Sequence, residues 1–125
     1  MPPEPGLTAR VHLDVTDADT ALAVGSGDVP VLATPRVVAL CEQASIAALD
    51  DSLAGGTTSV GMRVQLDHLA PTAVGHTVTA EATLEKVEGR RLVFTVAVRD
   101  ARSLVAAGKV TRVVVERDTF IDKAT

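Results

Sequence analysis

The stretch that decides the fold is VVALCEQASIAAL, residues 37–49. It is almost continuously apolar, rich in alanine and leucine, and free of glycine and proline. A helix that is apolar on all sides is a buried one. Thr34 and Pro35 stand where such a helix would begin, because threonine caps helices and proline is tolerated at the first helical position. We therefore predict a buried helix from Thr34 to about Leu53, stopped by the glycine pair that follows.

The segments on both sides of this helix alternate between apolar and polar residues, as half-buried strands do. One strand is predicted from Ala9, a loop with a short helical turn over residues 16–30, and four antiparallel strands after the helix. This order predicts an α+β fold in which a curved antiparallel sheet wraps around one long central helix. The domain is predicted to span residues 9–117, between a flexible N-terminus (1–8) and a C-terminal tail (118–125).

Three details of the strands bear on the site. In the last strand, Gly108 is predicted to mark a bulge. A single sheet of five strands also leaves unpaired edges, which predicts dimerisation edge to edge. In the first strand after the helix, a period of two predicts that the inward face is shared by Val60, Met62, Val64, Leu66 and His68.

Composition excludes several classes of protein. The 125 residues carry a net charge of −4 and no long Lys/Arg cluster, and tryptophan and tyrosine are absent, so we expect no nucleic-acid partner. The single Cys41 allows no internal disulfide and suits a reducing cytoplasm. The N-terminus lacks the pattern of a signal peptide, and no apolar run reaches the length of a membrane span. We expect a cytoplasmic protein with no membrane partner.

Glu42 is the exception within the apolar helix. Its helical neighbours are Val38, Ala39, Ser45 and Ile46, none of which is basic, so no ion pair within the helix explains it. Burial of an unpaired carboxylate is costly. Either this part of the helix meets solvent or a neighbouring chain, or the carboxylate serves chemistry; the residues leave these two interpretations about equally open.

Three further residues are candidates for a site with Glu42. His68 is predicted to face inward at a strand end, where it and Glu42 would form an acid/base pair if both reach one pocket; a lone inward histidine is more often a core residue. Thr34 is most simply a helix cap, although a cap hydroxyl can also face a ligand. Gly61 either marks a bulge or lets its amide approach a substrate oxygen.

Other chemistries find no support in the sequence. It contains no GxSxG, P-loop, GxGxxG or HExxH motif, and we predict no cofactor. Cys41 lies in an apolar run and is predicted to pack in the core. His12 and His76 lack neighbouring carboxylates or thiols, so no metal site is predicted.

The combination of these residues resembles hotdog-fold thioesterases and, more closely, the fluoroacetyl-CoA thioesterase family. The resemblance covers roughly residues 28–117, and the order Thr, Glu, Gly, His is its most specific feature. The pieces that carry it are Ala33-Thr34, Leu40-Cys41-Glu42, Ser59-Val60-Gly61, Asp67-His68, Pro71-Thr72 and the turn VEGRRL at residues 87–92.

The resemblance implies a homodimer that cleaves an acyl-CoA thioester to a free acid and coenzyme A at the subunit interface, and it leaves open whether dimers pair further into a tetramer. Thr34, Glu42 and His68 match the catalytic trio, and Gly61 matches the position whose amide holds the thioester carbonyl. Glu42 would attack the carbonyl or activate water, His68 would manage protons, and Thr34 would position the carboxylate.

The sequence departs from the family at the segment just before the helix. Residues 24–30 contain no aromatic residue where the fluoroacetyl-specific enzyme has a phenylalanine-bearing lid, so another short or medium acyl-CoA is the expected substrate. Arg90 and Arg91 are candidates to meet the phosphates of coenzyme A, although exposed turn arginines are usually only solvated. Two alternatives remain: a non-catalytic hotdog dimer that binds acyl-CoA or another small apolar ligand, and a hotdog hydratase.

Overall fold

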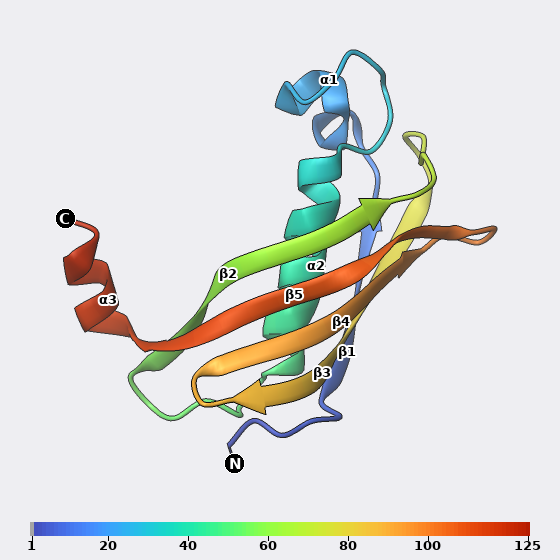
Figure 1. Ribbon diagram of the computed structural model, residues 1–125. Helices are drawn as coiled ribbons and strands as arrows, with labels where there is room; N and C mark the ends of the chain where they lie inside the picture. Colours follow the sequence, from blue (N-terminus) through green and yellow to red (C-terminus); the bar gives the residue numbers. More distant parts are fainter. Residues whose placement is uncertain (1) are drawn as a thin grey trace.

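The computed structural model describes residues 2–125. Within them, five strands form one antiparallel sheet in the order β1-β3-β4-β5-β2, which curls around the long helix α2 (Figure 1). This confirms the predicted α+β architecture. In chain order the elements are β1 (Thr8–Asp14), the 3-10 helix η1 (Asp17–Asp19), α1 (Ala21–Val24), α2 (Thr34–Ala48), β2 (Thr57–His68), β3 (Thr77–Glu88), β4 (Arg91–Arg99), β5 (Leu104–Glu116) and α3 (Arg117–Lys123).

The core lies between α2 and the concave face of the sheet. On β3 as far as Leu84 and along β4 every second residue is buried, as the alternation predicted, and these side chains pack against the apolar face of α2. The helix lies mainly over β1 and β3. At the other side of the sheet, β2 is an edge strand, and the face of α2 nearest to it keeps Ile46 52% exposed.

Both ends of α2 differ from the prediction. The helix stops at Ala48, before the expected Leu53, and Asp51 takes a left-handed conformation with φ of 58°. Two consecutive acids at a helix C-terminus oppose the helix dipole, which favours this earlier end. At the other end the cap is Ala33, and Thr34 is the first helical residue with no capping bond, so the interpretation of Thr34 as a cap is wrong.

A bulge in β2 changes which residues face the helix. The pairing of β2 with β5 passes from Gly61 opposite Arg112 directly to Arg63 opposite Thr111, which leaves Met62 as the extra residue. Val64, Leu66 and His68 keep the predicted inward phase, but the extra residue reverses the phase before it. Ser59 and Gly61 therefore face α2, and the inward placement predicted for Val60 and Met62 is wrong; Met62 is 42% exposed.

Gly108 does not mark the bulge predicted there. It pairs in regular register with Leu66 on β2 and Val96 on β4. A Cβ at this position would overlap the backbone carbonyl of Gln65, so the glycine is needed because two strands approach closely.

The start of β1 and the end of β5 lie at the same end of the sheet. The segment before β1 is tied down by a bond from the Gly6 amide to the Leu84 carbonyl (2.8 Å). Residues 118–125, predicted to be a tail, include most of α3, which stands away from the sheet (Figure 1) and exposes Phe120 and Ile121. None of the helices within residues 2–125 is both long and apolar enough to cross a membrane.

Candidate active site

Thr34 and His68 meet where α2 begins and β2 ends. The Thr34 Oγ1 lies 2.8 Å from the Nδ1 of His68, and we call these two residues the imidazole pair. The hydroxyl is free to reach the ring because Ala33, not Thr34, caps the helix. The Nε2 of His68 is buried and has no hydrogen-bond partner among the described residues. Burial lowers the pKa of His68, which keeps the ring neutral and ready to take up a proton.

The loop before α2 is anchored so that the imidazole pair keeps its place. Asp19 of η1 accepts a bond from Arg36 Nε at 3.0 Å, and its own carbonyl accepts the amide of Ala33 at 2.9 Å. Burial raises the pKa of Asp19, but hydrogen bonds from Thr16 and Arg36 outweigh this effect and lower the pKa overall. The carboxylate is thus charged and holds Arg36, which stands two residues after Thr34 on α2.

Glu42 has a partner that the sequence analysis missed. Arg112 of β5 donates from Nη1 to Glu42 Oε2 at 2.9 Å, from Nε to Ser59 Oγ at 2.8 Å and from Nη2 to the Ser59 carbonyl at 3.0 Å. We call these three residues the carboxylate cluster. The Arg112 side chain is 5% exposed and that of Glu42 is 32% exposed. The acid is therefore fixed from one side by a buried cation and open on the other side.

Gly61 lies directly beside this carboxylate. The bulge at Met62 turns Gly61 toward α2, and a Cβ built there would overlap Oε2 of Glu42. Only glycine leaves the carboxylate in its place, and the bare backbone at Gly61 is exposed next to it. The arrangement offers a charged oxygen next to backbone that a carbonyl group can approach closely.

Within one chain the carboxylate cluster and the imidazole pair lie apart. Thr34 and Glu42 are separated by eight residues on α2, which is about 12 Å along the helix axis. Gly61 and His68 are separated by seven residues on β2, which is roughly 20 Å of extended strand. The structure thus brings Thr34 to His68 and Glu42 to Gly61, and the meeting of the two groups stays a prediction for a second chain.

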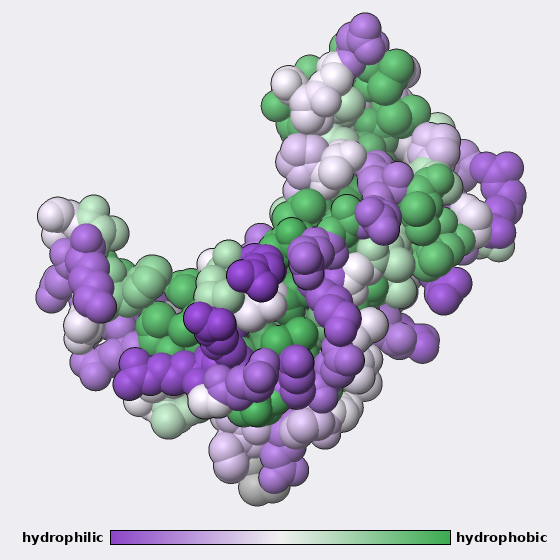
Figure 2. All heavy atoms as spheres, in the orientation of Figure 1, coloured by the Kyte–Doolittle hydropathy of each residue, from purple (hydrophilic) through white to green (hydrophobic). Residues whose placement is uncertain are grey.

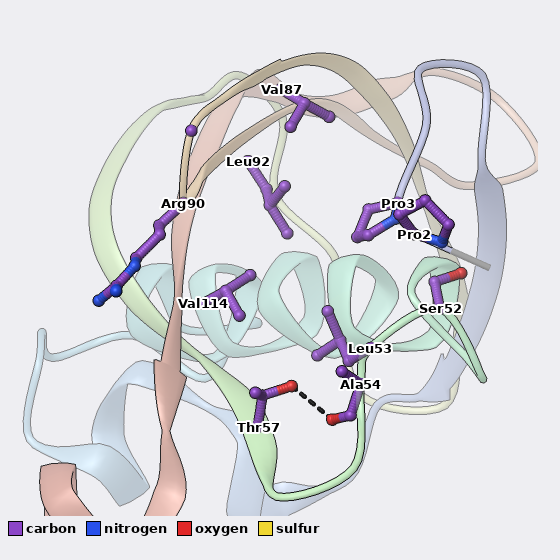
Figure 3. Close-up of a pocket in the computed structure, with 11 residues that line it drawn as sticks. Pro2, Pro3, Ser52, Leu53, Ala54, Thr57, Val87, Arg90, Leu92 and Val114 are labelled. Atoms are coloured by element: carbon purple, nitrogen blue, oxygen red, sulfur yellow. Dashed lines mark hydrogen bonds between the residues drawn. The ribbon is translucent and has the colours of Figure 1, made fainter.

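The two arginines predicted to bind coenzyme A phosphates lie on different sides of the sheet. Arg90 lies in the turn between β3 and β4, and its guanidinium points away from the other labelled side chains of an apolar cavity (Figure 3). Arg91 lies on the outer, convex face beside Arg63 and Lys109. They do not form one phosphate site within the chain, and their role stays a prediction.

Cys41 takes no part in the site. Cys41 is fully buried, and burial together with the charge of Glu42 raises the pKa of its thiol to about 11, so it packs in the core as predicted. Within residues 2–125 there is no group of three His, Cys, Asp or Glu side chains that could hold a metal ion.

Known proteins match this fold and this chain. The sequence profile of the fluoroacetyl-CoA-specific thioesterases matches residues 15–118. The fluoroacetyl-CoA thioesterase of Streptantibioticus cattleyicolor is 37% identical over 90 residues, which is 72% of this chain. The match spans 65% of that relative's own length.

Solved structures agree. A variant of a fluoroacetyl-CoA thioesterase in complex with acetyl-CoA superimposes with a TM-score of 0.91 and 28% identity over 97% of this chain and 96% of the other. A hot-dog-like protein from Thermanaerovibrio acidaminovorans superimposes with a TM-score of 0.87 and 30% identity, over 96% of this chain and 89% of the other. These matches confirm the predicted hotdog fold, and the chain belongs to the family of fluoroacetyl-CoA-specific thioesterases.

Proposed function

We propose that the protein is an acyl-CoA thioesterase, which hydrolyses a short- or medium-chain acyl-CoA to a free acid and coenzyme A in the cytoplasm. Thr34, Glu42 and His68 act together at the interface of a homodimer. The observation that carries this proposal is the carboxylate of Glu42, which Arg112 fixes beside the open backbone of Gly61. The family to which the chain belongs supports the reaction class.

Glu42 supplies the attack on the thioester carbonyl in one of two ways. As a general base it takes a proton from water while the oxygen adds to the carbonyl carbon; as a nucleophile it adds directly and water then cleaves the anhydride. In both routes the bond between carbon and sulfur breaks and the thiolate takes up a proton. The exposed backbone of Gly61 lies beside Glu42, and its amide would stabilise the carbonyl oxygen.

The imidazole pair handles the proton of the leaving thiol. His68 is neutral, so it can take a proton from water or from Glu42 and return it to the thiolate of coenzyme A. Thr34 holds the ring through Nδ1 and thereby directs Nε2 toward the reacting groups. The Nε2 of His68 is buried without a hydrogen-bond partner among the described residues, so it is the ring nitrogen that is left for this exchange.

A second copy of the chain joins the two halves of the site. The strand β2 is twelve residues long, and the edge that faces away from β5 pairs with no strand within residues 2–125. The surface is hollowed beside this edge, between α3 and the end that carries α1 (Figure 2). If two β2 edges pair antiparallel about a twofold axis that crosses at Gln65, residues on the same face lie opposite one another, and the extra residue Met62 brings Gly61 of one copy opposite His68 of the other.

The acyl group is expected to be one other than fluoroacetyl. A related structure contains acetyl-CoA, which supports a short acyl ester for this chain as well. The segment of residues 24–30 has no aromatic side chain with which to recognise fluorine selectively. The proposal therefore extends the reaction of the family to this protein without its fluorinated substrate.

A thiol-release screen over acyl chain lengths tests the proposal. Purified protein should release coenzyme A from at least one short or medium ester, and Glu42→Gln, His68→Ala and Thr34→Ala should each lower the rate. The buried Cys41 thiol does not disturb a thiol reagent in this assay. Binding of esters without any thiol release would instead favour the non-catalytic dimer, and loss of enoyl-CoA absorbance would favour the hydratase.

A further inference from the structure

An apolar cavity of about 440 Å³ lies at the C-terminal end of α2 (Figure 3). Leu53, Val87, Leu92 and Val114 point into it, and Pro3 lies at its rim. Cavities of this size are typical of small-molecule sites, and apolar ones take apolar ligands. None of the groups assigned above to the reaction lines it, apart from the predicted phosphate ligand Arg90.

The cavity begins one layer below the carboxylate cluster on both strands. On β5, Val114 is the next inward residue after Arg112, and on β2, Thr57 is the next inward residue beyond Ser59. Residues two apart on a strand are separated by about 7 Å. Along α2 the same direction leads from Glu42 to the helix end at Ala48 and then on to Leu53, so all three elements place the cavity on one side of the cluster.

The Arg112 guanidinium belongs to the layer next to the cavity and does not itself line it. It starts on β5, reaches Ser59 on β2 through two hydrogen bonds and reaches Glu42 on α2 through a third. It is one of the few charged groups in the interior, and it is almost fully buried. A bridge that touches all three elements closes the path from the reacting carbonyl beside Glu42 and Gly61 into the cavity.

We propose that Arg112 sets the acyl chain length by sealing this cavity from the reaction site. The inference rests on the proposed thioesterase function and narrows it: the substrate is a short-chain acyl-CoA, because a longer chain meets the guanidinium and Ser59. The apolar cavity is a chain-binding space that the fold contains and the wild-type protein does not use. Removing the bridge opens it to acyl groups of medium length.

The test compares kcat/KM for octanoyl-CoA and acetyl-CoA. The wild type should prefer acetyl-CoA, and Arg112→Ala should raise the octanoyl-to-acetyl ratio at least tenfold, because each methylene that leaves water improves binding by roughly a factor of four. Ser59→Ala frees the guanidinium while keeping its pair with Glu42, so it should raise the ratio less. Both variants are expected to lose acetyl-CoA activity, and the ratio is unaffected by a loss common to both esters.

A filled cavity provides the matched control. Val114→Phe places a ring in the cavity just below Arg112; alone, it should leave acetyl-CoA turnover and the ratio unchanged, and with Arg112→Ala it should return the ratio toward the wild-type value. If Val114→Phe alone lowers octanoyl-CoA turnover, the chain already uses the cavity and the proposal is wrong. An unchanged ratio in Arg112→Ala also overturns it.

A binding measurement keeps the test independent of catalysis. Calorimetric titration of acetyl-CoA and octanoyl-CoA into Glu42→Gln, with and without Arg112→Ala, measures the octanoyl-to-acetyl ratio of binding affinities without turnover. A wild type that releases thiol from no ester defeats the proposed function. If the ratio of the affinities for octanoyl-CoA and acetyl-CoA is the same with and without Arg112, then Arg112 does not seal the cavity, whether or not the wild type is an enzyme.

Discussion

The carboxylate cluster and the imidazole pair differ in how firmly their side chains are held. Arg112 is buried and holds Glu42 still, with one hydrogen bond to its carboxylate and two to Ser59. His68 is neutral, has a single side-chain partner in Thr34, and keeps Nε2 without one among the described residues. The first group is fixed for attack and the second is left free to exchange a proton. Because they lie about 12 Å apart along α2, neither group is a complete site within one chain.

The largest expected effect is at the fixed carboxylate. Glu42→Gln keeps an oxygen that Arg112 can donate to but removes the charge, so thiol release should fall by about 10²- to 10⁴-fold, the usual contribution of a general base or more. The measurement is kcat/KM on the best ester of the screen. The unfolding midpoint should also fall, because the buried Arg112 loses its charged partner, so the rates are compared at a temperature at which both proteins are folded. A variant that keeps its rate would remove Glu42 from the mechanism.

Gly61 tests whether the position of the carboxylate matters as well as its charge. Gly61→Ala places a methyl group where Oε2 of Glu42 lies, so the carboxylate must move, and a displacement of about 1 Å is expected to cost about a hundredfold in rate. Gly55→Ala is the matched control because a Cβ there meets no atom within 4 Å. Equal rates for both variants would show that the close approach has no catalytic meaning.

The neutral imidazole predicts a smaller effect, which depends on pH. Burial holds the pKa of His68 below its ordinary value of 6.5. The acid limb of kcat/KM should therefore fall below pH 6.5, because the neutral ring persists to lower pH than an exposed histidine would allow. A limb at or above that value would contradict the assignment of this limb to His68.

The free energy of unfolding should also depend on the titration of His68, and it should rise with pH. Between the folded and unfolded pKa values the unfolded chain binds more protons, so the free energy of unfolding rises with pH there. The contribution of His68 is complete above about pH 6.5 and is lost as the pH falls toward the lowered folded value. Urea unfolding across this range should show a slope in the wild type that is reduced in His68→Ala.

The sequence predicted the scaffold better than the contacts. The apolar run at residues 37–49 and the strands that alternate around it determine the fold, because burial of one helix by one curved sheet satisfies both patterns. The bulge at Met62 left no signal beyond a neighbouring glycine, although it reverses the faces of the preceding residues. Periodicity describes a regular strand, so one extra residue changes every assignment on one side of it.

Arg112 was missed for a related reason. It stands in phase with Val110 and Val114, which would have marked it as an inward charge. The alternate positions Val113 and Val115 are also apolar, so the inward face of this strand could not be chosen from the sequence. The same ambiguity hid the partner of Glu42 and left its burial unexplained. Thr34 was found because Thr-Pro marks the start of a helix, and His68 because it continues the inward phase of a strand up to its end.

The central claim is that Glu42 of one subunit completes the imidazole pair of the other, and mixing inactive variants tests it most directly. Co-expressed Glu42→Gln and His68→Ala chains form hybrid dimers in which one site has both residues intact, so about a quarter of the wild-type activity should return. Thr34→Ala with His68→Ala is the control, because both changes fall in the same half and no activity should return. If the first mixture is no more active than its separate variants, the site is not shared between subunits.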